Sequence, residues 1–276
     1  TGSISGPHLH FEIRNKKGKP FNPLLTNYKI KDTIHPTPEK IIFTNLDKGS
    51  YINGTPTQIE FNLRKISDQK YICDDIISVI GEFGVSLEIY DKINSQPFNF
   101  GIYSIKLEID GEKTYESKYN HIGFEEGAKV YNERDYSKHT NERKKVYSLY
   151  KKNNVPPSSF IKKKYYNKLN FKDGLYHKGK IIATDFNENQ IEIDFTFLSD
   201  KIRVNEFNII EKKNGIIIEY KDDTIKDINI QLSDRFHNGL HYGNIPIETI
   251  SEGTYFIKYP KFKFDVISYQ PVYNTG

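Results

Sequence analysis

Two histidines near the start of the chain have a spacing that could support metal chemistry. The segment from Pro7 to Ile13 reads PHLHFEI and alternates polar and apolar residues. In a β-strand, residues two apart share a face, so His8, His10 and Glu12 would lie on one side. The two imidazoles would then stand roughly 7 Å apart, at about 3.3 Å per residue. One imidazole could bind a metal ion while the other reaches a water or an oxyanion on that ion.

A histidine pair alone does not make a zinc site, because such sites use three or four protein ligands. The alternative interpretation is a half-exposed strand that carries two histidines. The surrounding string is TGSISGPHLHFEIR, followed by Gly18 in a predicted turn and by Asn22-Pro23. This first tenth of the chain resembles the C-terminal end of the catalytic domain of lysostaphin/LytM-type zinc metallopeptidases, where the usual string is close to TGxSTGPHLHFE and then NP. Ile4 and Ser5 depart from that pattern, and both are loop positions.

The resemblance implies roles for both histidines. His10 would be a zinc ligand, and His8 would be the catalytic histidine that assists the zinc-bound water or the developing oxyanion. The family's other two ligands, a His and an Asp, lie upstream of this string, and only seven residues precede His8. The chain also contains no Met. We therefore expect it to begin inside the catalytic domain and to be inactive by itself.

The function implied by the resemblance is that of an exported zinc metalloendopeptidase. Its substrate would be the peptide stems or cross-bridges of peptidoglycan, and its location would be extracytoplasmic, in the periplasm or cell envelope or secreted. The alternative is a non-catalytic protein of the same fold family that binds or regulates a protein of the cell envelope. A third hypothesis makes the β domains the functional unit, as an adhesin-like or carbohydrate-binding module.

The composition indicates a folded chain rich in strands. It holds 20 Tyr and 18 Phe in 276 residues, which argues against disorder and favours β structure. The net charge of +4 suits an anionic envelope and does not by itself indicate nucleic acid. There is no apolar stretch of 18 residues, so we predict no membrane span. The one Cys excludes an internal disulfide.

Short alternating segments between turn signals predict antiparallel sheets. Asn53-Gly54 and Asp110-Gly111 are typical hairpin dipeptides. The predicted strands are 40–46, 58–63, 76–80, 84–90, 102–109, 114–119, 179–184, 190–197, 216–220, 225–232, 253–259 and 262–268. This spacing is typical of immunoglobulin-like β-sandwiches.

The fold class expected is mainly all-β. Residues 1–28 would be the remnant of the peptidase sheet, and residues 29–38, with Pro36 and Pro38, would be a linker. Residues 39–200 would form an immunoglobulin-like sandwich with a helical or irregular insertion near 124–170, and residues 201–276 a second, smaller β domain. The order of a peptidase domain, a linker and a β-rich region resembles that of envelope peptidases of Bacteroidetes-type bacteria.

Two further motifs have a metal interpretation and a simpler one. The segment 185–189 (DFNEN) matches the start of a calcium loop, but Gln190 and Thr196 stand where that loop needs Gly and Glu, so a hairpin turn is favoured. His237 and His241 are four residues apart, but the glycine between them argues against the helix that would align them.

Overall fold

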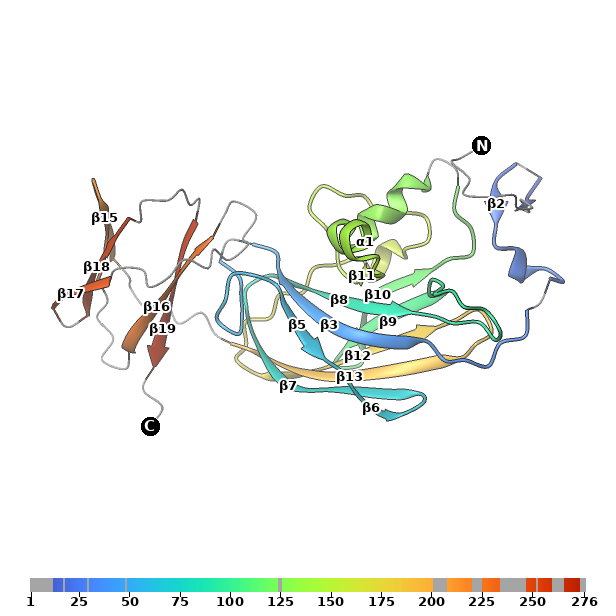
Figure 1. Cartoon of the computed structure of the whole chain (residues 1–276), viewed down its shortest axis with the longest axis horizontal. Coiled ribbons are helices and arrows are strands. Elements are labelled where there is room, and N and C mark those ends of the chain that lie inside the picture. Colours follow the sequence, from blue (N-terminus) through green and yellow to red (C-terminus); the bar gives the residue numbers. More distant parts are fainter. Residues whose placement is uncertain are drawn as a thin grey trace.

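The protein is built almost entirely from β-strands (Figure 1). The structure is a computed structural model that describes residues 12–16, 18–28, 30–47, 49–123, 126–200, 208–219, 225–233, 247–251, 253–259 and 266–273. The expected all-β class is confirmed. No helix in these ranges combines the length and the apolar character that a membrane crossing requires.

The strands between residues 37 and 199 form two sheets. The four-stranded sheet has the order β11 (Val146–Ser148), β8 (Phe83–Tyr90), β3 (Thr37–Asn45), β5 (Ile59–Asn62). The seven-stranded sheet has the order β10 (Glu112–Lys118), β9 (Ser104–Ile109), β12 (Tyr176–Thr184), β13 (Gln190–Ser199), β7 (Lys70–Ile80), β4 (Tyr51–Ile52), and β6 (Arg64–Ser67) also pairs with β7.

The strand order is that of an immunoglobulin-type sandwich. In chain order, β3, β8 and β11 take the places of strands A, B and E, and β9, β12 and β13 take those of C, F and G. Among the described strands, β13 and β7 make the one parallel pair. The alternation pattern does not distinguish parallel from antiparallel pairing, so this pair differs from the purely antiparallel expectation.

The burial of the strands follows their sequence patterns. In β9 and β13 buried residues alternate with partly exposed ones, because one face packs on the core. In β8 seven successive residues are buried, polar ones included. The insertion explains this burial: Lys144 forms an ion pair with Glu88, and the Tyr150 ring packs directly on Gly84.

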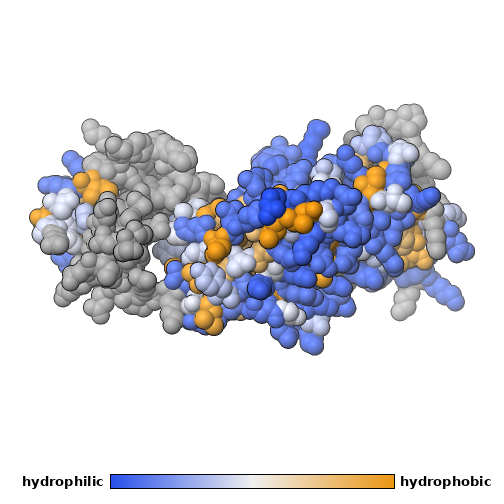
Figure 2. Space-filling view, turned by 90° about the horizontal axis from the view of Figure 1, so that it is seen from below, coloured by the Kyte–Doolittle hydropathy of each residue, from blue (hydrophilic) through white to orange (hydrophobic). Residues whose placement is uncertain are grey.

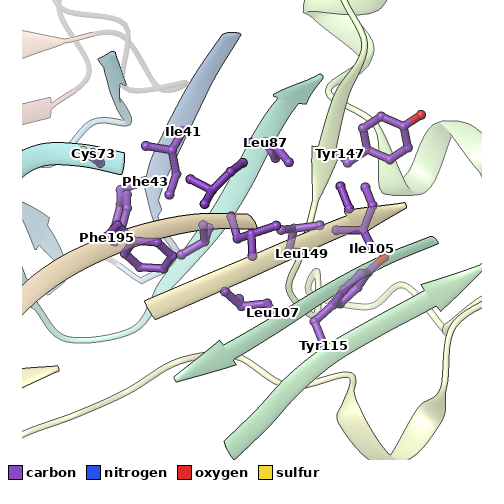
Figure 3. Packing of buried hydrophobic residues seen from close by; sticks show 14 of the residues in the cluster. Ile41, Phe43, Cys73, Leu87, Ile105, Leu107, Tyr115, Tyr147, Leu149 and Phe195 are labelled. Carbon is purple, nitrogen blue, oxygen red and sulfur yellow. The ribbon is translucent and has the colours of Figure 1, made fainter. Parts of the chain in front are cut away.

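Phenylalanines from both sheets fill the centre of the sandwich. The ring of Phe43 lies 5.6 to 5.9 Å from the rings of Phe61, Phe83 and Phe195, counted between centroids. Phe43 is fully buried, and Figure 3 shows it beside Phe195 with side chains from both sheets around them. Cys73 is part of this core and is buried.

The two hairpin dipeptides form the turns expected of them. Asp110 and Gly111 have φ of 51° and 83°, so both residues adopt the left-handed conformation of a type I′ turn between β9 and β10. Asn53 and Gly54 are also left-handed, and Ile52 exchanges two backbone hydrogen bonds across that turn. Local sequence fixes these turns because few residues tolerate positive φ.

The expected insertion is present and partly helical. It contains η3 (Ala128–Glu133), α1 (Tyr136–Glu142) and η4 (Lys163–Tyr165), together with the strand β11. The Asp135 carboxylate accepts a hydrogen bond from the Lys138 N–H, which caps α1, and Arg143 ends the helix in a left-handed conformation. β11 extends the four-stranded sheet by pairing with β8, and Figure 1 shows α1 on the same side of the sandwich as β11.

The N-terminal segment forms a small hairpin that is fixed to the sandwich. β1 (Ile13–Arg14) pairs with β2 (Pro20–Phe21), and Asn22 caps the following 3₁₀ helix η1 (Pro23–Leu25). The Asn22 N–H donates to the Asn120 carbonyl at 2.9 Å. Residues 30–36 have no regular structure, and β3 already begins at Thr37. Pro38 fits into β3 because β5 does not pair at that position.

The C-terminal strands form two further sheets. One has the order β14 (Asn208–Lys212), β15 (Gly215–Glu219), β18 (Thr254–Lys258), β17 (Ile247–Ser251). The other pairs β16 (Ile225–Ser233) with β19 (Val266–Tyr273). The division of the chain into domains at residues 28, 38 and 200 stays a prediction.

Candidate metal centre

The two histidines of the predicted peptidase site, His8 and His10, lie outside the described residues, as do His237 and His241. The described part begins at Glu12. Directly after it, Ile13 begins β1 of the β1–β2 hairpin. The assignment of His8 as catalytic and His10 as a metal ligand therefore stays a prediction.

His177 is the most constrained histidine that the structure describes. Its Nδ1 lies 2.6 Å from Asp110 Oδ2, and its Nε2 lies 3.1 Å from Asp173 Oδ1. Burial lowers the pKa of His177, but the hydrogen bonds and charges of these two aspartates outweigh burial, so the pKa is raised. The imidazole stacks on Phe197, which makes it part of the sandwich core.

One metal-capable group occurs within the described ranges, and it contains no histidine. It consists of Asp32, Asp91 and Asp185, which each offer a carboxylate oxygen within 4.8 Å of the others. All three are buried, with exposed fractions of 7%, 4% and 2%. Such a set offers oxygen ligands only, whereas zinc sites in proteins favour His and Cys, so the group does not fit the zinc expected from the motif.

Three separate segments bring these aspartates to one end of the sandwich. Asp91 directly follows β8, and Asp185 directly follows β12. Asp32 lies in the irregular segment that precedes β3. The end of β8 pairs with the start of β3 in one sheet, and the end of β12 pairs with the start of β9 in the other. The proximity of the three carboxylates places these strand ends together.

Hydrogen bonds hold two of the three carboxylates in place. Asp32 Oδ1 accepts from the backbone N–H groups of Ile34 and Asn94 at 3.1 and 3.2 Å. Asp185 accepts from the backbone and the side-chain amide of Asn189 at 2.9 and 2.7 Å. Asn189 Nδ2 also donates to the Asp32 carbonyl at 3.3 Å, which ties the two segments together.

Asp91 is the carboxylate of this group that has a buried oxygen, Oδ1, without a hydrogen-bond partner among the described residues. Burial raises the pKa of Asp91 to about 7, and the charges of Asp185 and Asp32 add to the shift. Burial also raises the pKa of Asp185, although the hydrogen bonds from Asn189 oppose it. The group therefore concentrates negative charge where little solvent screens it.

A cavity of about 340 Å³ adjoins the carboxylates. Asp32, Asp91, Asp185 and Asn187 contribute to its lining, and the remaining lining is largely apolar. Arg134 also lines the cavity, but its guanidinium lies 3.5 Å from the centre of the Tyr147 ring, and no ion pair joins it to the aspartates. An ion and its waters could reach the carboxylates through this space.

The sequence singles out Asp185 only as part of a segment, 185–189, that matches the start of a calcium loop, and it predicts a hairpin turn there and not a metal site. The structure shows that turn, since Asp185 and Asn189 are hydrogen-bonded across it, and it also places the Asp185 carboxylate beside two others. Asp32 and Asp91 carry no local signal, because they meet Asp185 only through the order of the strands.

The surface of the sandwich is mostly hydrophilic with scattered apolar side chains, as Figure 2 shows for one face. Among the described aromatic residues, Tyr28, Phe98 and Tyr176 are exposed, and they come from three different segments. Within these ranges no row of exposed aromatics follows a strand, which is the feature that a carbohydrate-binding module would need.

Comparisons of the chain with models of protein families, with curated proteins and with solved structures found no match.

Proposed function

We propose that this chain belongs to an exported zinc metalloendopeptidase that cleaves peptide bonds of peptidoglycan. The observation that carries the proposal is the PHLHFE string in its TG…GPHLHFE…NP setting. A bound zinc would act as a Lewis acid that polarises the scissile carbonyl and lowers the pKa of a bound water toward ~7. His10 would hold this ion, and His8 would exchange a proton with the attacking water or hold the developing oxyanion.

The way the sandwich holds the N-terminal segment supports this proposal. The motif runs directly into the β1–β2 hairpin, and the Asn22 backbone is hydrogen-bonded to Asn120 beyond the end of β10. Farther along, Asn187 Nδ2 donates to the Ile30 carbonyl at 2.7 Å. The sandwich would thus hold the hairpin that follows the motif, and the modest positive charge of the chain suits an anionic envelope.

The first test is the reading frame upstream of Thr1. An upstream His and Asp within a β-rich domain would supply the two remaining ligands and support the peptidase. An upstream region without these ligands would contradict it and favour the alternative, a non-catalytic protein that binds or regulates a partner in the cell envelope.

The second test is biochemical and uses the chain joined to the residues that its gene encodes upstream. Purified peptidoglycan is the substrate, and released peptides and bound zinc are measured. We expect His10→Ala to abolish both zinc binding and activity, and His8→Ala to keep zinc while activity falls by about 10²–10⁴-fold. His121→Ala is the matched control, because His121 is exposed and outside the motif. Zinc retained in full by His10→Ala would refute the assignment.

A further inference from the structure

The three aspartates at the edge of the sandwich form a site that the peptidase proposal does not use. We propose that Asp32, Asp91 and Asp185 together bind one calcium ion, which joins the segment before β3 to the ends of β8 and β12. This inference is independent of the proposed zinc chemistry, because none of its residues belongs to the PHLHFE string.

The first step is the negative charge of the three carboxylates, which a bound cation would neutralise. Three carboxylates with oxygens within 4.8 Å repel one another once they are ionised, and burial strengthens that repulsion. In the described part of the chain, no Lys, Arg or His forms an ion pair with any of the three. Lys92 follows Asp91 directly, but its ammonium lies near the Tyr90 ring, 5.9 Å from the ring centre.

The second step is the unmatched oxygen of Asp91. This residue is 4% exposed, and its Oδ1 has no hydrogen-bond partner among the described residues. A buried acceptor left without a donor costs free energy, and a bound cation would remove that cost. The carboxylate that carries this oxygen lies beside the two that would complete the site.

The third step is the choice of ion. Calcium takes six to eight oxygen ligands from carboxylates, carbonyls and waters, and tolerates irregular geometry. Each of the three carboxylates offers an oxygen to the site, and the adjoining cavity leaves room for waters to supply the remaining ligands. Magnesium demands a near-ideal octahedron and keeps several waters, and zinc prefers nitrogen and sulfur, so a set of three buried carboxylates fits calcium best.

The site would connect three parts of the fold. Asp91 follows a strand of the four-stranded sheet, and Asp185 follows a strand of the seven-stranded sheet. Asp32 belongs to the segment that leads from the N-terminal hairpin into β3. One ion would therefore link both sheets to this segment and fix the direction in which the N-terminal hairpin leaves the sandwich.

The experiment measures calcium binding to the full chain after treatment with EDTA and dialysis. Isothermal titration with calcium chloride gives the stoichiometry. Terbium luminescence gives a second readout, because the chain has no Trp and both Tyr103 and Tyr119 line the adjoining cavity and could sensitise the ion. Three variants are compared: Asp91→Asn, Asp32→Asn and, as the matched control, Asp75→Asn, whose carboxylate is exposed on β7.

We expect one calcium per chain, with binding lost in Asp91→Asn and Asp32→Asn and unchanged in Asp75→Asn. Asp32→Asn guards against misfolding, since its amide oxygen can still accept the two backbone N–H groups. With a Kd in the range of extracellular sites, about 10 mM calcium should raise the unfolding midpoint of the wild type by about 3–10 °C. Magnesium at the same concentration should give less than half of this shift.

Three outcomes would overturn the proposal. The first is a wild-type chain whose unfolding midpoint and titration heat do not respond to calcium. The second is calcium binding that survives in Asp91→Asn and Asp32→Asn. The third is a shift with magnesium that equals or exceeds the shift with calcium. Loss of peptidase activity plays no part in this test, so its failure and the failure of the zinc proposal are distinguishable.

Discussion

Replacement of Asp91 by Asn should stabilise the metal-free protein at high pH and not at low pH. The pKa of Asp91 is raised from 3.8 to about 7, first by burial and then by the charges of Asp185 and Asp32. An acid whose pKa is raised by folding keeps its proton up to a higher pH in the folded state than in the unfolded state. The stability that this proton provides is present below about pH 4 and is lost as the pH rises from about 4 to about 7.

The magnitude follows from the shift. The pKa difference is about three units, and each unit corresponds to about 1.4 kcal/mol, so ionised Asp91 lowers the free energy of unfolding by about 4 kcal/mol at pH 8. Asparagine has nearly the same shape and carries no charge. We therefore expect Asp91→Asn to exceed the wild type by about 2–4 kcal/mol at pH 8 in EDTA and to match it near pH 4.

The assay is urea unfolding in EDTA at several pH values, followed by circular dichroism. Glu133 also has a pKa raised by burial to about 7, but it is present in both proteins and cancels in the difference. The exposed Asp75→Asn serves as the control and should follow the wild type throughout. An Asp91→Asn variant no more stable than the wild type at pH 8, or a difference that does not shrink toward pH 4, would refute this view of the buried carboxylates.

Three further predictions concern the sandwich. Phe43→Ala should lower the free energy of unfolding by about 3–5 kcal/mol, measured by urea unfolding, because it empties the centre of the aromatic core. Tyr147→Phe should cost about 1–3 kcal/mol in thermal unfolding, since it leaves the buried Ile102 N–H, now 2.8 Å from the phenol oxygen, without an acceptor. Burial lowers the pKa of His177, but hydrogen bonds to Asp110 and Asp173 outweigh burial, so this pKa is raised. The wild type should therefore lose stability as the pH rises above 6.5. His177→Gln should lack that part of the loss, and a wild-type curve parallel to the variant's curve across this range would contradict the assignment.

The sequence predicted most of the sandwich because its signals are local. Alternating residues identified the strands that became β5, β8, β9 and β13 to within two residues at either end, and β12 to within three. The dipeptide Asp110-Gly111 predicted its hairpin because left-handed backbone is accessible to few residues. The expected insertion is also present, with the short helices η3, α1 and η4.

Other elements escaped prediction because their partners are remote. β11 has three residues, Val146–Ser148, and lies in a charged stretch without alternation, yet all three are buried because it pairs with β8. The parallel pair of β7 and β13 joins strands more than a hundred residues apart. The residues of these segments show no sequence pattern that indicates which strand they pair with.

The same distinction holds for the two candidate sites. The peptidase proposal needs no tertiary structure, because the PHLHFE string and its setting, which carry the resemblance to the zinc peptidases, are consecutive residues. The aspartate group depends on tertiary structure alone. Residues 32, 91 and 185 meet because the ends of β8 and β12 and the start of β3 lie together at one end of the sandwich. The order of strands decides which carboxylates are buried together, and that order arises from packing of the whole core.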